Sequence, residues 1–281
     1  MVIYAFVKSP LEMQIYMIID FHTHTYPDKV AEKAVKKLYD LGGTPCFREP
    51  TLEGLIESTK KSGIDYSLSL PVATSPSQVE HINNLSAEMS GRDNVIFAGA
   101  IHPDSENVEE ILDFIKNAGL KVIKIHPDYQ GANFDDERYI KVMYEAAKRG
   151  IYTVTHAGVD AAYREKVHCT PDMILNVLDR LKGIIDNKLI LAHMGSNELA
   201  DEVIDKLCGK LVYFDTAYTI WKTPYRCEEI IKKHGPDKIL FATDSPWAPQ
   251  EEFIDIINSY DLSDEDKKKI LGENGRKILG I

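Results

Sequence analysis

The stretch KVIKIHPDYQGANFDDERYIKVMYEAAKRGIYTVTH (residues 121–156) contains one complete unit of a pattern that repeats along the chain. Its two ends, 121–125 and 151–155, are short apolar runs rich in β-branched residues, which favour strands. Between them, apolar residues recur at helical spacing, so 136–150 is predicted to form an amphipathic helix. A strand, a helix and a second strand in this order indicate parallel pairing of the two strands.

Similar apolar runs occur eight times in the 281 residues. Most intervals between them are wide enough for one crossover helix, and the first has room for two. Eight such units in a chain of this length predict a single α/β domain over residues 17–281, a closed (β/α)8 TIM barrel. An open doubly wound sheet is the alternative, but the first strand lacks the glycine-rich turn typical of that fold. The predicted strands are 17–20, 66–72, 95–100, 121–125, 151–155, 188–192, 211–215 and 238–242.

The composition is that of an ordinary globular protein, with 44% hydrophobic residues and a net charge of −11. This charge disfavours nucleic acid as a partner, because it repels phosphate backbones at long range. Four widely spaced cysteines favour reduced thiols and a cytoplasmic location. Residues 1–16 are interpreted as an N-terminal extension, for which an upstream start is one explanation. They lack the features of a signal peptide and are too short to span a membrane.

Polar side chains follow the predicted strands at their carboxyl ends, one strand after another. In a barrel these ends converge on one face, where active sites lie. A single histidine at a strand end is usually structural, and Asp244 before Ser245 could be a helix cap. A whole set in register instead predicts a shared metal site. The set comprises His22, His24, His102, His126, His156, His193 and Asp244.

The first strand carries the strongest part of this pattern. His22 and His24 are two residues apart on an extended segment, so their imidazoles point to the same side. Two such nitrogens, a third neutral imidazole and a carboxylate make a ligand set suited to zinc or a similar divalent ion. His81 and His234 lie within helical stretches and are interpreted as structural.

With these motifs the chain resembles the amidohydrolase superfamily. It is most similar to the amidohydrolase-related branch that includes aminocarboxymuconate-semialdehyde decarboxylase and several lactone and acyl hydrolases. The motifs run in the same order over nearly the full chain. They are IIDFHTH (18–24), KVIKIHP (121–127), TVTHAG (153–158), LILAHMG (189–195), ILFATDSPW (239–247) and a closing-helix segment, KILGENGRKIL (269–279).

The resemblance implies a (β/α)8 barrel that binds one divalent metal, expected to be Zn²⁺. The implied ligands are His22, His24, His156 and Asp244. In this reading His193 polarises the substrate or a bound water, and Asp244 also transfers a proton. Zinc would lower the pKa of bound water towards about 7 and so supply hydroxide at neutral pH.

The fourth predicted strand departs from the pattern of two-metal relatives, which carry a bridging carboxylated lysine or a glutamate there. This strand has no acidic residue, and Lys124 and His126 share one side of it. One metal is therefore favoured, with Lys124 as a structural or substrate-orienting charge and His126 lining the pocket. A carboxylated Lys124 would allow a second metal.

Loops after the strands set specificity in this fold. Arg164 and His168 are favoured as a pair that binds a carboxylate or another anion of the substrate. Further candidates for substrate contact are Tyr26, Asp128, Tyr129, Gln130 and Trp247.

The favoured function is hydrolysis of a small ester, lactone or amide by a zinc-activated water. The alternative is non-oxidative decarboxylation of an unsaturated or aromatic acid at the same metal site. A deoxyribonuclease is disfavoured by the charge of −11 and by Lys124 in place of a glutamate. A barrel that binds without catalysis is disfavoured by the complete set of metal-site residues. The substrate, and whether the chain forms a homodimer, stay open.

Overall fold

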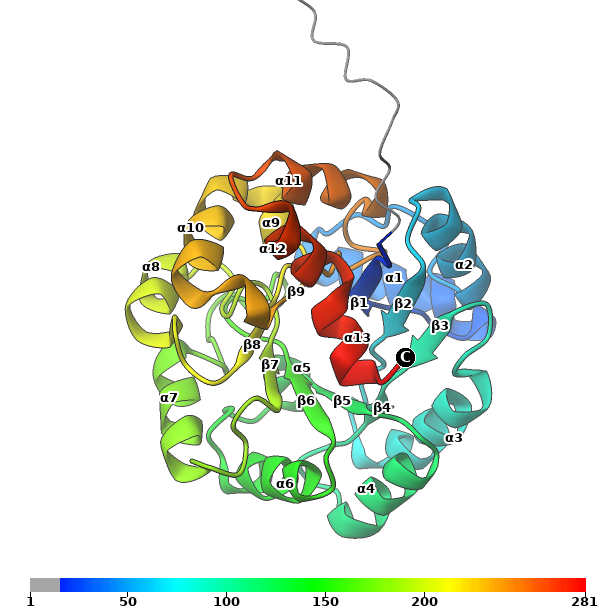
Figure 1. Ribbon diagram of the computed structural model, residues 1–281. Helices are drawn as coiled ribbons and strands as arrows, with labels where there is room; N and C mark the ends of the chain where they lie inside the picture. Colours follow the sequence, from blue (N-terminus) through cyan, green and yellow to red (C-terminus); the bar gives the residue numbers. More distant parts are fainter. Residues whose placement is uncertain (1–15) are drawn as a thin grey trace, which may run out of the picture.

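The computed structural model describes residues 16–281, so the predicted extension lies outside the described residues except for Tyr16. All eight predicted runs form parallel strands, with helices around them (Figure 1). The third run is interrupted at Ala98 and is divided between two short strands. The strands are β1 (Ile19–Thr23), β2 (Tyr66–Ser69), β3 (Val95–Phe97), β4 (Gly99–Ala100), β5 (Val122–Ile125), β6 (Tyr152–Thr155), β7 (Leu189–Leu191), β8 (Tyr213–Asp215) and β9 (Ile239–Leu240).

Backbone hydrogen bonds connect these strands into a ring. Strands β1 to β3 form one sheet and β4 to β9 another, in sequence order. At the interruption, the Ala98 N–H donates to the Ser69 carbonyl (2.9 Å), which keeps the third run paired with β2. At the other junction, the Phe21 N–H donates to the Phe241 carbonyl (2.8 Å), so the first strand pairs with the last. The predicted (β/α)8 barrel is confirmed.

Helices follow the strands as crossover connections, and the long first interval holds two of them, as expected. The predicted helix over 136–150 forms as α6, and the Asp136 side chain caps it by accepting the Arg138 N–H. The helices are α1 (Asp28–Gly42), α2 (Leu52–Lys61), α3 (Val79–Met89), α4 (Val108–Asn117), α5 (Pro127–Gln130), α6 (Glu137–Lys148), α7 (Pro171–Arg180), α8 (Ala200–Glu202), α9 (Thr219–Lys222), α10 (Pro224–His234), α11 (Phe253–Ser259), α12 (Asp264–Lys268) and α13 (Asn274–Leu279), with 3₁₀ turns at Pro76–Gln78, Pro236–Lys238 and Gln250–Glu252 and π-turns at Val203–Leu207 and Lys269–Glu273.

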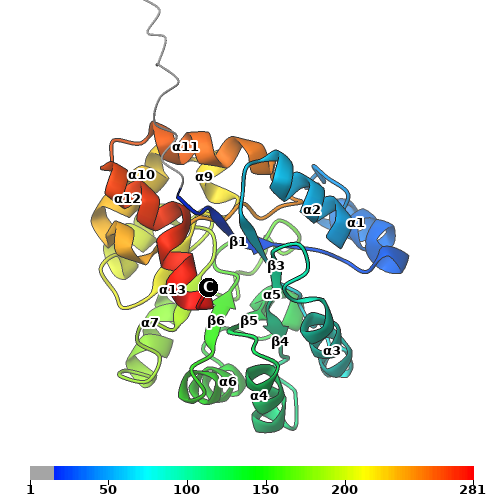
Figure 2. The same ribbon diagram turned by 45° about the vertical axis from the view of Figure 1, so that its right-hand side comes forward.

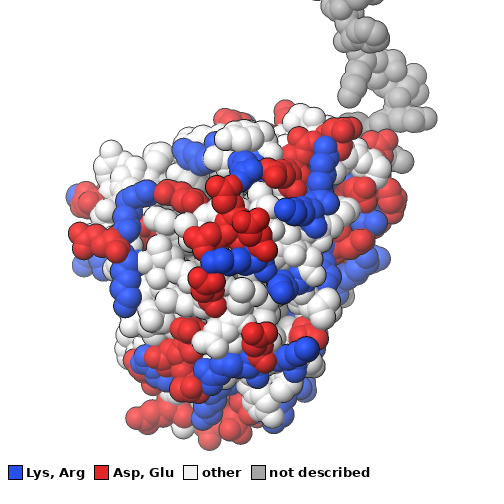
Figure 3. Space-filling view, turned by 90° about the vertical axis from the view of Figure 1, so that its left-hand side faces the viewer, with Lys and Arg blue, Asp and Glu red and all other residues white. Residues whose placement is uncertain are grey.

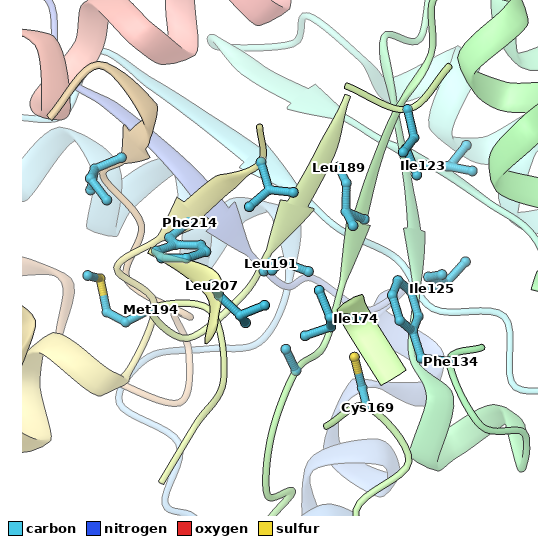
Figure 4. Close-up of a cluster of buried hydrophobic side chains, with 14 of the residues drawn as sticks. Ile123, Ile125, Phe134, Cys169, Ile174, Leu189, Leu191, Met194, Leu207 and Phe214 are labelled. Carbon is cyan, nitrogen blue, oxygen red and sulfur yellow. The ribbon is translucent and has the colours of Figure 1, made fainter. Parts of the chain in front are cut away.

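Alternation along each strand sorts side chains into two core layers. On β5, Val122 faces the inside of the barrel, whereas Ile123 and Ile125 face the helices. Figure 4 shows the outer layer, in which Ile123, Leu191 and other strand residues meet side chains such as Ile174 of α7. The inner layer fills the barrel, so the interior is a packed core and not a pore.

The C-terminal segment closes one end of the barrel. Helix α13 lies across the strands in Figure 1, and its Ile278 and Leu279 belong to the inner core layer. The Asn274 side chain donates to the carbonyls of Pro236 and Ile239, both at 2.8 Å. These contacts are at the amino ends of the strands. The opposite end, where the polar residues lie, is left to form a site.

The surface carries charged side chains of both signs, and the four cysteines, all of them in the described part of the chain, form no disulfide bond. On the face shown in Figure 3, basic and acidic side chains are interspersed, without an extended basic region. All four cysteines are free, and two of them, Cys169 and Cys227, are buried. Among the described residues, no helix combines the length and the apolar character that crossing a membrane requires.

His234 has the structural role expected of it. Its Nδ1 accepts the Gly209 N–H (3.1 Å), so its Nε2 must carry the proton that is donated to the Val212 carbonyl (3.0 Å). The ring also stacks on Phe214, with the centroids 3.9 Å apart. Protonation of Nδ1 would place a second donor opposite the Gly209 N–H, so this hydrogen bond would be lost. Burial lowers the pKa of His234 from its ordinary 6.5 to about 4.

This lowered pKa predicts a pH-dependent stability. The folded-state pKa of His234 lies below the unfolded one. The stability that the neutral ring contributes is therefore complete above pH 6.5, decreases as the pH falls below that value, and is lost once the pH has fallen through 4. We expect His234 to remove about 2 kcal/mol of the free energy of unfolding between pH 7 and pH 5. Urea unfolding at both pH values should show a smaller loss for His234→Gln, which keeps one acceptor and one donor. An equal loss in both proteins would contradict this assignment.

Candidate metal centre and its cavity

His22 is oriented by a carboxylate behind it. It lies at the end of β1, buried, and its Nδ1 is 2.8 Å from Oδ2 of Asp215 at the end of β8. The carboxylate accepts the Nδ1 proton, which leaves Nε2 as a bare nitrogen. Burial, and next the charge of Lys124, lower the pKa of His22, so the ring is neutral. The lone pair of Nε2 is therefore available to a ligand.

His24 is oriented in the same way by a backbone group. Its Nδ1 donates to the Leu70 carbonyl (2.9 Å), so its Nε2 is also bare. The two Nε2 atoms are 3.1 Å apart, and Oδ1 of Asp244 lies 3.2 Å from that of His24 and 3.5 Å from that of His22. Two lone pairs and a carboxylate oxygen at this spacing can hold a cation between them. Two imidazoles and a carboxylate fit a divalent metal ion.

Asp244 is held in an unusual backbone conformation. Its φ of 68° is in the left-handed region, which a non-glycine residue adopts only at a cost. Its N–H donates to the His22 carbonyl (2.8 Å), so the metal-facing turn is tied to β1. Burial alone would raise the pKa of Asp244. Positive charge held among the facing imidazoles, at His24 first, outweighs this and lowers the pKa; a cation bound between them acts in the same direction, so the side chain is a carboxylate.

His193 lies between the metal group and His156. Its backbone is also left-handed, with φ of 59°, and its N–H donates to Oδ1 of Asp215 (2.9 Å). Its Nδ1 donates to the Ala217 carbonyl (3.1 Å), and its Nε2 accepts from Nδ1 of His156 (2.9 Å). The rings of His22 and His193 are 5.5 Å apart between centroids.

The fourth expected ligand therefore lies one imidazole away from the other three. Within the described part of the chain, Nε2 of His156 is buried without a hydrogen-bond partner. A bare, buried nitrogen is consistent with a ligand, but His156 must release its bond to His193 to offer Nδ1 to the same ion. Its ligand role stays a prediction.

Lys124 places a buried positive charge beside the metal group. Its side chain is enclosed inside the barrel, and its Nζ is 3.3 Å from Nε2 of His22. Burial lowers the pKa of Lys124 to about 8, while the carboxylates of Asp215 and Asp244 favour the charged form. At pH 7 the amine is mostly protonated, which suits an anionic substrate.

His126 forms one layer of a stack of rings. Tyr129 lies on one face with centroids 3.8 Å apart, and His156 on the other at 4.3 Å, both nearly parallel. With Asp160, whose Oδ2 is 3.6 Å from Nε2 of His126, these histidines make a second group of possible metal ligands. The lone pairs of parallel rings lie in the ring planes and do not converge. The stack is better suited to form a wall of a binding site.

A cavity of about 770 Å³ opens above these residues. Most of the predicted site residues line it, including the expected substrate contacts at the ends of three different strands. Its other walls are largely aliphatic and aromatic. The predicted residues in the lining are His22, His24, Tyr26, Lys124, His126, Tyr129, His156, His193, Asp244 and Trp247.

Arg164 and His168 do not form the anion site expected of them. Arg164 is exposed and makes a bidentate ion pair with Glu198, at 2.7 and 3.0 Å. His168 is bonded through Nδ1 to Asp128 (2.8 Å). Neither lines the cavity; both side chains leave the loop after β6 and pair with acidic residues that follow other strands, Glu198 and Asp128. Gln130 is likewise structural, since its amide joins four neighbouring groups.

Two residues important to the geometry were not among the predicted ones. Asp215 ends the predicted strand 211–215, so the rule that singled out the other strand-end residues could have found it. Arg48 lies in the loop between α1 and α2, where no motif marks it. Its guanidinium donates to the His24 carbonyl and to the Ser245 hydroxyl, both at 2.7 Å. Arg48 thereby joins the turn that carries His24 to the turn that carries Asp244. Burial lowers the pKa of the Arg48 guanidinium to about 10.

Comparison with solved structures gives the same architecture. A 2,6-dihydroxybenzoate decarboxylase from Rhizobium is similar with a TM-score of 0.68 at 15% identity, covering 95% of this chain and 99% of that chain. A 5-carboxyvanillate decarboxylase from Novosphingobium aromaticivorans, complexed with manganese and 4-hydroxy-3-methoxy-5-nitrobenzoic acid, has a TM-score of 0.67 at 16% identity, covering 96% and 97%. A structure described as amidohydrolase II has a TM-score of 0.73 at 19% identity, covering 94% and 100%. At these identities the likeness establishes the fold.

Comparison of the sequence with family models identifies the family as well as the fold. No curated protein matches this chain. The family model described as amidohydrolase, however, matches residues 19–281, from the first residue of β1 to the end of the chain. The match spans all the strand ends that supply the metal centre. The chain belongs to the amidohydrolase family.

Proposed function

We propose that this protein is a metal-dependent, non-oxidative decarboxylase of an aromatic or unsaturated carboxylic acid. The observation that carries the proposal is an apolar, ring-lined cavity placed directly against a cation-binding group. Two of the similar structures are decarboxylases of aromatic acids, which supports the same reading. The order of the two functions favoured from the sequence is thereby reversed, and hydrolysis of an ester, lactone or amide becomes the second candidate.

One divalent ion is proposed, held by His22, His24 and Asp244, with His156 as the expected fourth ligand. Such an ion supplies positive charge that binds and polarises the oxygens of the acid. Zinc remains the expected ion from the donor set. Manganese is the other candidate, because the 5-carboxyvanillate decarboxylase structure contains it.

Asp244 is assigned the proton transfer. The reaction replaces a C–C bond by a C–H bond: the carboxyl group leaves as CO₂, and the electron pair left on carbon takes up a proton. Asp244 is the one carboxylate in the metal group and borders the cavity. Because the pKa of Asp244 is low and the acid binds as its carboxylate, the proton that Asp244 delivers is first taken up from solvent.

The other residues of the cavity bind and orient the acid. Lys124 supplies a buried positive charge next to the metal group. His193 lies against His22, where its bare Nε2 can accept a hydrogen bond from the substrate or from a water after losing its bond to His156. His126, Tyr129 and Trp247 present flat faces that suit a planar unsaturated acid. The proposed partner is thus a small molecule, with the cytoplasm as the proposed location in view of the four free thiols.

Measuring the metal content tests the first premise of this proposal, that the chain binds a divalent ion. Protein purified without chelators should contain about one divalent ion per chain, measured by elemental analysis. The double variant His22→Ala, His24→Ala should contain almost none, because it lacks two of the three converging ligand atoms. His234→Gln, which removes a histidine far from the cavity, should retain the ion. No bound metal in the unaltered protein would refute the proposal, and a ratio near two would favour a carboxylated Lys124.

Release of CO₂ tests the reaction itself. Metal-loaded protein should release CO₂ from at least one member of a panel of hydroxylated benzoic acids and unsaturated acids. The rate should fall by about 10²–10⁴-fold in Asp244→Asn if that residue transfers the proton. The same protein is also tested with a panel of esters, lactones and amides. Hydrolysis of these without any CO₂ release would overturn the decarboxylase in favour of the second candidate.

Asp215 is predicted to set the metal affinity without touching the ion. In Asp215→Asn, the amide that faces Nδ1 of His22 favours the tautomer whose proton is on Nε2. Metal affinity should then fall by about 10–100-fold, with the fold retained.

Asp20→Asn is the matched control, because Asp20 is an equally buried carboxylate at the same end of the barrel. Its side chain accepts from Thr243, from Gln250 and from the backbone N–H of His22, and is bonded to no imidazole. Titration of the metal-free proteins with zinc, alongside thermal unfolding, separates the two effects. Equal losses of affinity in both variants would show that Asp215 is only a structural carboxylate.

A further inference from the structure

The cavity extends beyond the metal centre. Besides the strand ends, its lining includes side chains from α1, α2 and α3. Figure 2 shows these helices on one side of the barrel, next to β1, β2 and β3. The cavity therefore has two parts, the polar end at the metal centre and a second part among these helices.

The helical lining consists of two regular stripes. On α1 the lining includes Asp28 and Gly42 at the two ends and, between them, Ala34, Lys37, Leu38 and Leu41, which recur at the spacing of one helix face. On α3 the lining residues are His81, Ile82, Leu85, Ser86 and Met89, again one face. Each helix thus turns a continuous, mainly apolar face toward the cavity. His81, assigned only a structural role from the sequence, lies on the α3 face.

The connection between the two parts runs past the end of β2. Leu70 and Val72, which follow that strand, line the cavity. So does Phe97, whose side chain is on the outer face of β3 and packs with Leu55 and Ile56 of α2. A cavity bordered both by His22 and by the outer face of β3 must leave the barrel end and continue between strands and helices. We name this part the apolar arm, lined by Leu38, Leu41, Leu52, Ile82, Leu85, Met89 and Phe97.

Protein atoms do not cover the apolar arm fully. Leu38 and Leu85 are only half-buried, and Leu41 is 52% exposed. Helix α1 buries just one residue completely, Ala31, although the helix is strongly amphipathic. The charged or titratable groups that line the cavity from these two helices are Asp28, Lys37 and His81, all three exposed. Apolar faces left open in this way inside a cavity are typical of a binding site for an apolar group.

We propose that the substrate is a carboxylic acid with an extended hydrocarbon chain, its carboxylate at the metal centre and its chain in the apolar arm. This inference rests on the proposed function, since it assigns the acid group to the metal end. The volume of about 770 Å³ is in the upper part of the range of roughly 300–1,000 Å³ for ligand pockets, more than a single-ring acid fills. Among the lining residues, Met89 has an unbranched side chain that adapts well to a flexible hydrocarbon chain.

Calorimetric titration of the metal-loaded protein with butanoate, hexanoate and decanoate tests the inference. Burying each additional methylene strengthens binding by up to about fourfold. Decanoate should therefore bind at least about thirtyfold more tightly than butanoate, a margin that allows for incomplete burial. Binding measured in this way does not depend on turnover.

Two leucine-to-tryptophan variants test where the hydrocarbon chain of the acid lies. Leu85→Trp puts a larger side chain into the apolar arm, so it should weaken decanoate binding at least tenfold and leave butanoate binding unchanged. Leu178→Trp is the matched control, because Leu178 is also a half-buried leucine of an outer helix but does not line the cavity. It should change neither affinity. Thermal unfolding of both variants confirms that they are folded.

The outcomes separate the arm from the proposed reaction. If butanoate binds and decanoate binds no more tightly, or if Leu85→Trp keeps the decanoate affinity, the apolar arm is refuted and the decarboxylase stands. If none of the three acids binds, the acid site and the arm both fail. If chain length and Leu85→Trp act as expected but no acid releases CO₂, the arm stands and the decarboxylase fails.

Discussion

The site depends on two bare imidazole nitrogens that face each other at hydrogen-bond distance. Each is bare because an acceptor behind the ring takes the proton of the other nitrogen: Asp215 for His22 and the Leu70 carbonyl for His24. These acceptors come from β8 and from the end of β2, whereas the histidines come from β1. No single strand or pair of strands could produce this arrangement. The metal centre therefore exists only when the barrel is closed.

The same closure allows the barrel to tolerate groups that destabilise it. A lysine is buried inside the barrel, and His193 and Asp244 have left-handed backbones. Backbone N–H groups of both residues are bonded to Asp215 and to the His22 carbonyl, respectively, which holds the strained turns in place. Apolar packing on both faces of the strands and the closing helix α13 supplies the stability that these turns need.

Much of this organisation could be predicted from local pattern. Strand positions follow from apolar runs, and residues at their carboxyl ends meet because parallel strands end on the same face. Pairing between loops could not be predicted in this way. Arg164 and His168 are close in sequence, yet each has an acidic partner from elsewhere, Glu198 and Asp128. The interruption at Ala98 also has no local signal, since it reflects how the third run pairs with its two neighbours.

The two parts of the cavity differ in how they are constrained. Side chains at the metal end come from strands, and each is fixed by hydrogen bonds across the barrel. The apolar arm comes from helices, and α1 in particular is held by few buried contacts. A change in α1 can thus alter what the arm accepts without moving the ligands. The loop after α1 connects the two parts: Arg48 bonds to the His24 carbonyl and to Ser245, and the Phe47 N–H donates to the Pro246 carbonyl (2.8 Å). A hydrocarbon chain in the apolar arm that shifted α1 would act on the turns of His24 and Asp244 through this loop.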